Sequence, residues 1–227
     1  MEQQKLSFEI LFINDACPDN SLDVLKSLAS SDERVGVISL LKNSGQNAAL
    51  LVGLMHAQGD SIVTMDADLQ DEPECIPGML DALQQGYDAV FAGKYGAYES
   101  PFRILSSRLF KLTLNVITLG SVPWHSGLFI AMKQNTVKQI LSNAPPNPHL
   151  ITLIGLTKVP MYSIPTLRPP RPEGKSSYSF IKRMKVALCA LSTLMHVFLF
   201  KKNKFVTPKF ITYAGQPFQS KLKALNL

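Results

Sequence analysis

Short apolar runs alternate with helix-like segments along most of this chain, and that alternation restricts the fold more than any other feature. The predicted strands are residues 8–13, 35–40, 61–65, 87–92 and 127–132, with an extended segment at 160–167. The predicted helices are residues 21–28, a segment opened by residues 43–47 and reaching about 57, and residues 73–85, 101–119 and 136–141. A strand–helix–strand rhythm of this kind predicts an α/β fold with a mostly parallel sheet and helices on both faces.

Polar clusters stand where the first three predicted strands end. Asn14-Asp15 closes the first, residues 43–46 follow the second, and Asp66-Ala-Asp68 follows the third. Parallel strands bring such clusters to one edge of the sheet, where α/β proteins bind ligands. Two carboxylates this close repel each other unless a cation is near, and a hard divalent ion carrying substrate phosphates suits them.

Each cluster also has an ordinary structural explanation. Asp15 can cap a helix, Gly45 can serve a turn, and Asp66 with Asp68 can form a solvated acidic turn. A basic, glycine-containing stretch at residues 168–178 can be a solvated linker. Together, however, the four clusters supply what a nucleotide-sugar site needs: polar groups for base and ribose, carboxylates for a metal, and cations for a leaving nucleotide.

Composition and charge are consistent with one folded domain and a basic tail. The chain has 227 residues, of which 46% are hydrophobic and 18% charged, which argues against disorder. The net charge of +6 is uneven: residues 1–167 sum to −5, and residues 168–227 to +11. Such a tail suits anionic lipid, phosphate groups or nucleic acid. The three scattered cysteines fit a reducing compartment and form no metal-ligand pattern.

Four motifs in order resemble the family 2 glycosyltransferases. They are Phe-Glu-Ile-Leu-Phe-Ile-Asn-Asp, Lys-Asn-Ser-Gly-Gln-Asn-Ala-Ala-Leu, Met-Asp-Ala-Asp-Leu-Gln-Asp-Glu-Pro-Glu and Arg-Pro-Glu-Gly-Lys-Ser-Ser-Tyr-Ser. The chain is most similar to the branch that moves a sugar from a nucleotide onto a polyprenyl phosphate. The resemblance implies a Rossmann-like GT-A fold over residues 1–180, an inverting transfer, and Mg²⁺ or Mn²⁺. A basic helical tail at residues 181–227 would follow.

The resemblance also implies roles for individual residues. Asp66 and Asp68 match the metal-binding pair. The residues implied to bind the donor nucleotide are Asn14, Asp15, Asn43, Gly45, Gln46 and Asp66. Gln70, Asp71 and Ser177 match the acceptor side. Asp68, Arg171 and Lys175 match the groups that stabilise charge on the leaving diphosphate.

The chain departs from this family in two places. Relatives often have Gly-Asp-Phe-Arg where this chain has Gly127-Leu-Phe-Ile130, so an acid and a base are absent. His125 nearby is either a substitute polar contact or a packing residue. Relatives also begin with an apolar strand that the few residues before residue 8 are too short to supply, so we expect the sheet to lack a central strand and leave edges unpaired.

The segment 182–204 predicts a contact with a membrane surface. Fifteen residues without charge, 186–200, lie between two basic clusters, which suits an anionic bilayer surface but is short for a spanning helix. The alternative is a core helix covering the sheet. With no signal peptide in the sequence, we expect an enzyme of the cytoplasm or the cytoplasmic membrane face. Two alternatives stay open: an inactive nucleotide-binding remnant of such an enzyme, and a protein that binds nucleic acid through its basic tail. For the enzyme itself, no nucleic-acid partner is expected.

Overall fold

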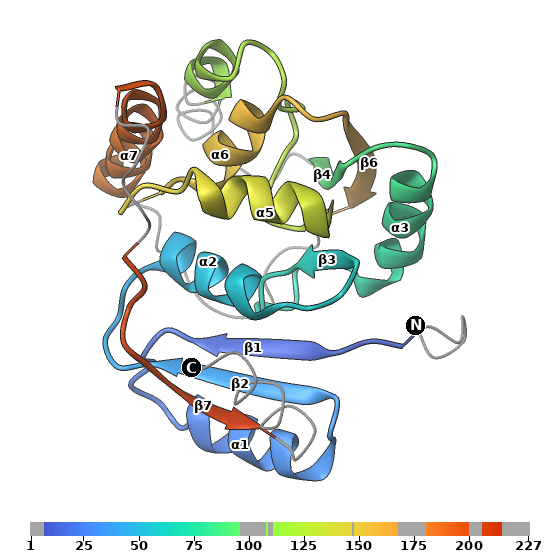
Figure 1. Cartoon of the computed structure of the whole chain (residues 1–227), viewed down its shortest axis with the longest axis vertical. Coiled ribbons are helices and arrows are strands. Elements are labelled where there is room, and N and C mark those ends of the chain that lie inside the picture. The colour runs from blue at the N-terminus through green and yellow to red at the C-terminus, as the bar shows by residue number, and fades with distance from the viewer. Residues whose placement is uncertain are drawn as a thin grey trace. The chain divides into compact units, whose positions relative to one another are not determined.

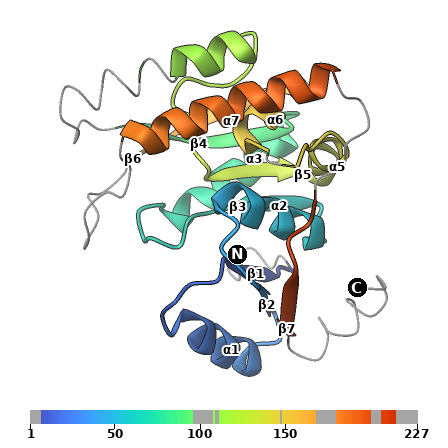
Figure 2. The ribbon, with the colours of Figure 1, turned by 90° about the vertical axis from the view of Figure 1, so that its left-hand side faces the viewer.

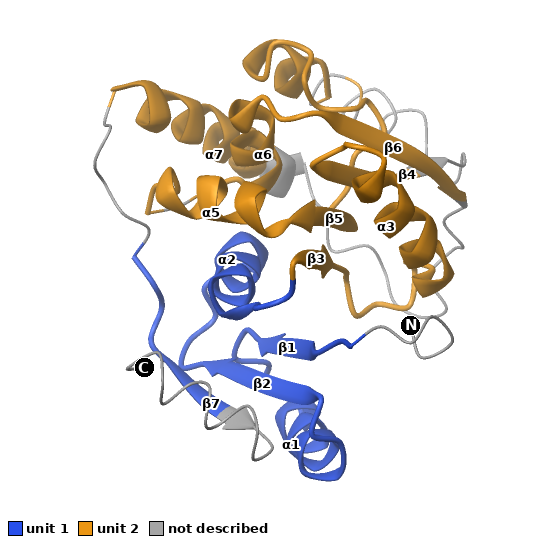
Figure 3. Ribbon diagram, turned by 45° about the vertical axis from the view of Figure 1, so that its right-hand side comes forward, with its two compact units in different colours: residues 1–59, 206–227 blue, residues 60–205 orange. Residues whose placement is uncertain are grey.

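The computed structural model describes residues 7–95, 108, 111–146, 148–167, 180–199 and 206–214. The chain forms two compact units, residues 1–59 with 206–227, and residues 60–205 (Figure 3). Arg171, Lys175 and Ser177, with the rest of the predicted basic loop, lie outside the described residues.

The first unit is a three-stranded sheet with helices on both faces (Figure 1). Its elements are β1 (Ile10–Asn14), α1 (Ser21–Ser31), β2 (Val35–Leu40), α2 (Gln46–His56) and β7 (Phe210–Ala214). The strand order is β1-β2-β7, with β1 and β2 parallel and β7 antiparallel to β2. The parallel pair places the ends of β1 and β2 at one edge, as the sequence predicts.

Alternation along the strands explains the two covered faces. Phe12 pairs with Val37, and both pack with α1, whereas the neighbouring residue Ile13 lies under Gly53 of α2. A Cβ on Gly53 would approach the Ile13 side chain to 3.2 Å, so α2 packs closely on β1. On the same face, the buried His56 ring meets Phe210 of β7 edge-on, at 5.1 Å between ring centroids.

The second unit contains a four-stranded sheet in the order β3-β5-β4-β6. Its elements are β3 (Ser61–Thr64), the 3-10 helix η2 (Pro73–Cys75), α3 (Ile76–Gln84), β4 (Ala89–Tyr95), β5 (Ile130–Lys133), α5 (Gln134–Ser142), α6 (Leu150–Thr157), β6 (Met161–Leu167) and α7 (Phe180–Leu199). Residues 111–117 are also helical. Strand β5 runs antiparallel to β3 and β4, and β4 is parallel to β6.

One core cluster of this unit lies between α3 and a face of the sheet. Met79, Ala82 and Leu83, at spacings of three and four residues, form the buried stripe of α3, and they pack with Val90 and Phe129. Figure 2 shows α7 as the longest helix of the unit, and α7 contacts α6. Within the described ranges, no helix combines the length and the hydropathy needed to cross a bilayer.

Several element bounds differ from those predicted. The strand predicted at 127–132 begins only at Ile130, because its partner β3 ends at Thr64, opposite Ile130. The strand predicted at 87–92 continues to Tyr95, because β6 pairs with β4 that far. The helix predicted from Pro73 opens with a 3-10 turn before α3. Sequence reasoning missed α6 and β7.

Both sheets are open among the described residues, so the outer strands β1 and β7, and β3 and β6, each have an unpaired edge. Within the described part of the chain, β1 pairs only with β2, and β3 pairs only with β5. Ile10 on β1 is 43% exposed, although it belongs to an apolar run. Every open sheet has two such edges, so the lack of a central strand stays a prediction.

Candidate functional site

Asp15 organises the site residues of the first unit. Its two carboxylate oxygens accept hydrogen bonds from the backbone N–H groups of Ser44 and Gly45, at 2.7 and 2.8 Å. The side-chain amide of Asn43 donates to the Asp15 carbonyl oxygen at 3.1 Å. The structure therefore brings the predicted residues Asp15, Asn43 and Gly45 into one cluster, tying the loop after β1 to the loop that opens α2.

The backbone of these loops requires unusual conformations at two positions. Gly45, directly before α2, has φ +86°, a value that an L side chain rarely adopts. Ala16 has φ +53°, which turns the chain sharply after Asp15. Gln46 then starts α2 as an exposed residue. The predicted donor-binding residues thus stand on a shaped loop pair at the carboxyl ends of parallel strands.

Asn14 contributes a buried polar side chain at the end of β1. Its Oδ1 accepts the Cys17 N–H at 3.0 Å, and the residue is 4% exposed. Its Nδ2 is buried without a hydrogen-bond partner in the described structure. Asp19 follows in the same loop, where hydrogen bonds from the side chain and backbone of Ser21 lower its pKa. A buried donor such as Asn14 Nδ2 costs free energy unless a ligand or water accepts a hydrogen bond from it.

The acidic loop of the second unit follows β3 and is stabilised by its own backbone. The Asp66 N–H donates to Asp71 Oδ2, and the Gln70 N–H donates to Asp68 Oδ1, both at 3.3 Å. Leu69 has φ +58° and is 80% exposed, so the chain reverses there. Gln70 is buried. The structure thus brings together the four predicted residues from Asp66 to Asp71, with Asp66, Asp68 and Asp71 half-buried.

The segment before β5 lies against the end of β3. The Thr64 hydroxyl donates to the Leu128 carbonyl oxygen at 2.7 Å. Phe129 and Ile130 are buried in the core, and Leu128 is half-buried. His125 is half-buried as well. Residues 127–130 therefore present backbone and apolar side chains beside the acidic loop, and no ionisable group.

The donor atoms of the acidic loop suit a hard divalent cation. Asp66 and Asp68 offer carboxylate oxygens, and Mg²⁺ sites often combine one or two carboxylates with substrate phosphates and water. Among the residues that the structure describes, no three His, Cys, Asp or Glu side chains form a metal-binding cluster. Two carboxylates can supply only part of the coordination shell of such an ion.

Sequence reasoning did not identify two of these features. It gave no role to Thr64, whose hydroxyl bond to Leu128 depends on the antiparallel pairing of β3 with β5. It also did not foresee that Asp15 binds the amides of Ser44 and Gly45, because a contact across 29 positions leaves no local signal. The Asp-x-Asp spacing and the glycine at position 45 were the signals that did locate the two loops.

Comparisons with known proteins identify the family of this chain. The model of the family "Glycosyl transferase family 2" matches residues 1–147. An uncharacterised glycosyltransferase of Bacillus subtilis, YkcC, is 29% identical over 197 residues, covering 86% of this chain and 61% of that protein. An undecaprenyl-phosphate 4-deoxy-4-formamido-L-arabinose transferase of Edwardsiella ictaluri is 30% identical over 77% of this chain and 54% of its own length. The chain thus spans little more than half of these relatives.

A solved structure shows the same fold. Glucosyl-3-phosphoglycerate synthase of Mycobacterium tuberculosis, solved with Mn²⁺, UDP-glucose and phosphoglyceric acid, aligns with a TM-score of 0.55. The alignment covers 93% of this chain and 79% of that structure, at 16% identity. A family match over well over half of the residues, with the fold of the GT-A enzymes around it, shows that this chain belongs to glycosyl transferase family 2.

Proposed function

We propose that the protein transfers a sugar from a nucleotide-sugar donor to a lipid phosphate, with inversion at the sugar carbon and with the help of Mg²⁺ or Mn²⁺. The observation that carries this proposal is the half-buried carboxylate loop at Asp66 and Asp68, at the end of β3 in a family 2 domain. The names of the relatives support both halves of the reaction. One is a transferase acting on undecaprenyl phosphate, and another was solved with Mn²⁺ and UDP-glucose.

The loops around Asp15 and Gly45 would bind the nucleoside. Asn14 Nδ2 is a buried donor without a partner in the described structure, and a base or ribose oxygen is a suitable acceptor for it. Asp15 holds the neighbouring amides in place, so that little ordering remains to be done when the nucleotide binds. Asn43 and Gln46 stand beside this loop pair as further polar contacts.

Asp66 and Asp68 would hold the cation, and Arg171 and Lys175 would add positive charge to the leaving diphosphate. A bound divalent ion supplies Lewis-acid stabilisation of phosphate charge that grows as the glycosidic bond breaks. Guanidinium and ammonium groups would stabilise the same negative charge, Arg171 by paired hydrogen bonds and Lys175 as a point charge. Gln70, Asp71 and Ser177 would face the acceptor.

The acceptor is inferred from a missing group. A sugar hydroxyl needs a base to take its proton, whereas a lipid phosphate is already an anion and needs mainly positioning. Residues 127–130 offer no ionisable side chain beside the acidic loop, and Phe129 and Ile130 are buried in the core. This favours the phosphate acceptor. A lipid-borne acceptor in turn favours membrane contact through residues 182–204 at the cytoplasmic face.

The test is transfer of radiolabelled sugar from UDP- and GDP-sugars onto a short polyprenyl phosphate, with Mg²⁺ or Mn²⁺. We expect Asp68→Asn to abolish metal-dependent transfer and metal-dependent binding of the nucleoside diphosphate. The fold should survive, because the asparagine keeps the Oδ1 that accepts from Gln70. Asp81→Asn, an exposed acid of α3, is the matched control and should behave as wild type.

Each outcome separates the candidate functions. Normal turnover by Asp68→Asn would show that Asp68 is not a metal ligand. Nucleotide binding without transfer by the wild-type protein would identify an inactive remnant. Thermal stabilisation by an oligonucleotide, but not by a nucleoside diphosphate with metal, would point to the basic tail and nucleic acid instead.

A further inference from the structure

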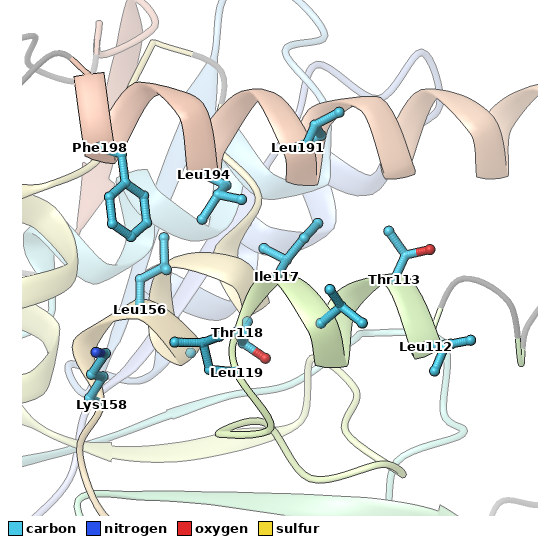
Figure 4. Close-up of a pocket in the computed structure, with 12 residues that line it drawn as sticks. Leu112, Thr113, Ile117, Thr118, Leu119, Leu156, Lys158, Leu191, Leu194 and Phe198 are labelled. Carbon is cyan, nitrogen blue, oxygen red and sulfur yellow. The ribbon is translucent and has the colours of Figure 1, made fainter.

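An apolar groove of about 630 Å³ lies on the second unit, between α6, α7 and the helical residues 111–117 (Figure 4). Leu191, Leu194 and Phe198 of α7 form one wall, and residues from Leu112 to Leu119 form the wall facing it. Lys158 and Phe198 stand at one end of the groove, and Leu112 at the other. Pockets that bury most of a small ligand have volumes in this range, roughly 300–1,000 Å³.

Helix α7 is fixed to the protein by the face that does not line the groove. Ala190 and Thr193 are buried, and the Thr193 hydroxyl accepts the His149 N–H at the start of α6, at 2.9 Å. The same hydroxyl donates to the Cys189 carbonyl oxygen. The opposite side of the helix carries exposed apolar residues, among them Leu191 at 44% and Phe198 at 68% exposure. Helix α7 is therefore anchored at its buried face, and its exposed apolar face remains available to a ligand.

The groove offers few polar groups to a ligand. One of its two threonines, Thr118, already donates its hydroxyl to the Leu114 carbonyl oxygen. Among the described residues that line it, Lys158 alone carries a charge; this exposed lysine ends α6 in the left-handed conformation, with φ +55°. A peptide strand would find almost no backbone partners here. A long apolar chain with an anionic end fits the lining better.

The segments that line the groove carry charge of one sign. From residue 100 to residue 227 the sequence contains 18 lysine and arginine residues, and Glu173 is its sole carboxylate side chain. The three segments that line the groove, 111–119, 150–158 and 180–199, contain no acidic residue. Apolar segments that carry lysine and arginine but no acidic residue are attracted to anionic bilayers.

From this we propose that the groove between α6, α7 and residues 111–117 binds one hydrocarbon chain of an anionic bilayer lipid, with the lipid headgroup at Lys158. The groove would thereby fix the second unit to the membrane by a lipid taken up into the protein, in addition to attraction at its surface. The inference rests on the membrane contact proposed above. Its test uses no donor and no turnover, so its failure leaves sugar transfer standing.

The experiment is binding of the intact chain to vesicles of phosphatidylglycerol and of phosphatidylcholine, measured by co-sedimentation. We expect Leu191→Asp to weaken binding to phosphatidylglycerol vesicles roughly 10- to 100-fold, because it places a charge on the groove wall where the hydrocarbon chain would contact a leucine. Leu28→Asp on α1 is the matched control, since Leu28 is a helical leucine of 43% exposure outside the groove. It should bind as wild type does.

Two further measurements locate the lipid. Lys158→Asn keeps a residue that tolerates positive φ, removes the charge, and should weaken binding severalfold at low salt and little at high salt. Phosphatidylglycerol with a diazirine in its acyl chain should label the groove walls, residues 111–119 and 191–198. The Lys138→Gln variant on α5 is the charge control, and it should retain wild-type affinity.

Specific results would overturn the proposal. If the wild type binds the vesicles and Leu191→Asp binds them equally well, the groove takes no lipid chain, although the surface contact stands. Equal affinity for phosphatidylcholine overturns the anionic headgroup. A dimer in sedimentation velocity that Leu191→Asp dissociates would assign the groove to a second copy. Failure of the wild type to bind either vesicle refutes both the groove and the membrane contact.

Discussion

Replacing Asp15 with asparagine tests whether this carboxylate fixes the shape of the nucleotide-binding loops. Asp15 accepts two backbone hydrogen bonds, from Ser44 and Gly45. Hydrogen bonds to a charged acceptor contribute about 1.5–3 kcal/mol each, and water can reach these half-exposed groups, which favours the lower value. Asparagine keeps one acceptor oxygen and one neutral bond of about 1 kcal/mol. The expected net loss in the free energy of unfolding is therefore about 2 kcal/mol.

This loss corresponds to a fall in the unfolding temperature of roughly 4–8 °C for a chain of this size. Calorimetry measures it, and amide hydrogen exchange should show faster exchange at Ser44 and Gly45 in the variant. Nucleoside diphosphate binding should weaken in parallel, because the loops must then be ordered on binding. Asp23→Asn on α1 is the control, since it makes the same charge change at a side chain that is 79% exposed. It should alter stability by less than about 0.5 kcal/mol.

The reasoning is refuted if Asp15→Asn unfolds at the wild-type temperature and leaves exchange at Ser44 and Gly45 unchanged. The two bonds would then contribute nothing to loop shape. A stable variant with unchanged exchange but lost nucleotide binding would mean that Asp15 acts on the ligand directly.

Two further predictions concern the packing of α6. Burial lowers the pKa of His149 to about 4, so the folded protein keeps this side chain neutral at pH values where the unfolded chain protonates it, near pH 6.5. The free energy of unfolding is therefore highest above pH 6.5 and falls by roughly 3 kcal/mol as the pH drops to 4. His149→Asn, which retains a helix-capping side chain, should flatten that part of the stability–pH curve in urea titrations, and an unchanged slope contradicts the assignment. Gly155→Ala should destabilise by about 1–3 kcal/mol, because the new Cβ would lie 2.7 Å from Val122 Cγ2. Gly78→Ala, where the nearest atom is 3.7 Å away, should be neutral or stabilising in the same melts.

Much of the fold could be predicted from local patterns. The strand at 35–40 matches β2, and α2 and β3 lie within one or two residues of their predicted ends, because apolar runs and glycine turns mark them. Strand β7 could not be predicted, because its pairing with β2 joins positions about 170 residues apart and depends on the tertiary fold. Helix α6 was missed because it is short and mostly buried, and so shows no amphipathic stripe.

The site was predictable in its residue types but not in its bonding. Asp-x-Asp after a strand marks the acidic loop, and Asn14-Asp15 and Gly45 mark the other two loops. The sequence could not show that both carboxylate oxygens of Asp15 accept hydrogen bonds from backbone amides, since that depends on β1 and β2 being parallel neighbours in register. Nor could it show that residues 127–129 leave the strand, because this follows from where β3 ends.

The position of Asp15 gives a physical reason for the cation proposed at the acidic loop. The N-terminus of a helix attracts phosphate through its exposed N–H groups and its dipole. At α2, however, the amides of Ser44 and Gly45 already bind the Asp15 carboxylate, so the anion at this helix end is part of the protein. A diphosphate placed here would meet a negative charge. Its own charge must therefore be balanced by other groups, which is the role proposed for an ion at Asp66 and Asp68 and for Arg171 and Lys175. The variant Asp15→Asn makes this concrete: it removes the competing charge, so whatever nucleotide binding survives should depend less on divalent metal than binding by the wild type.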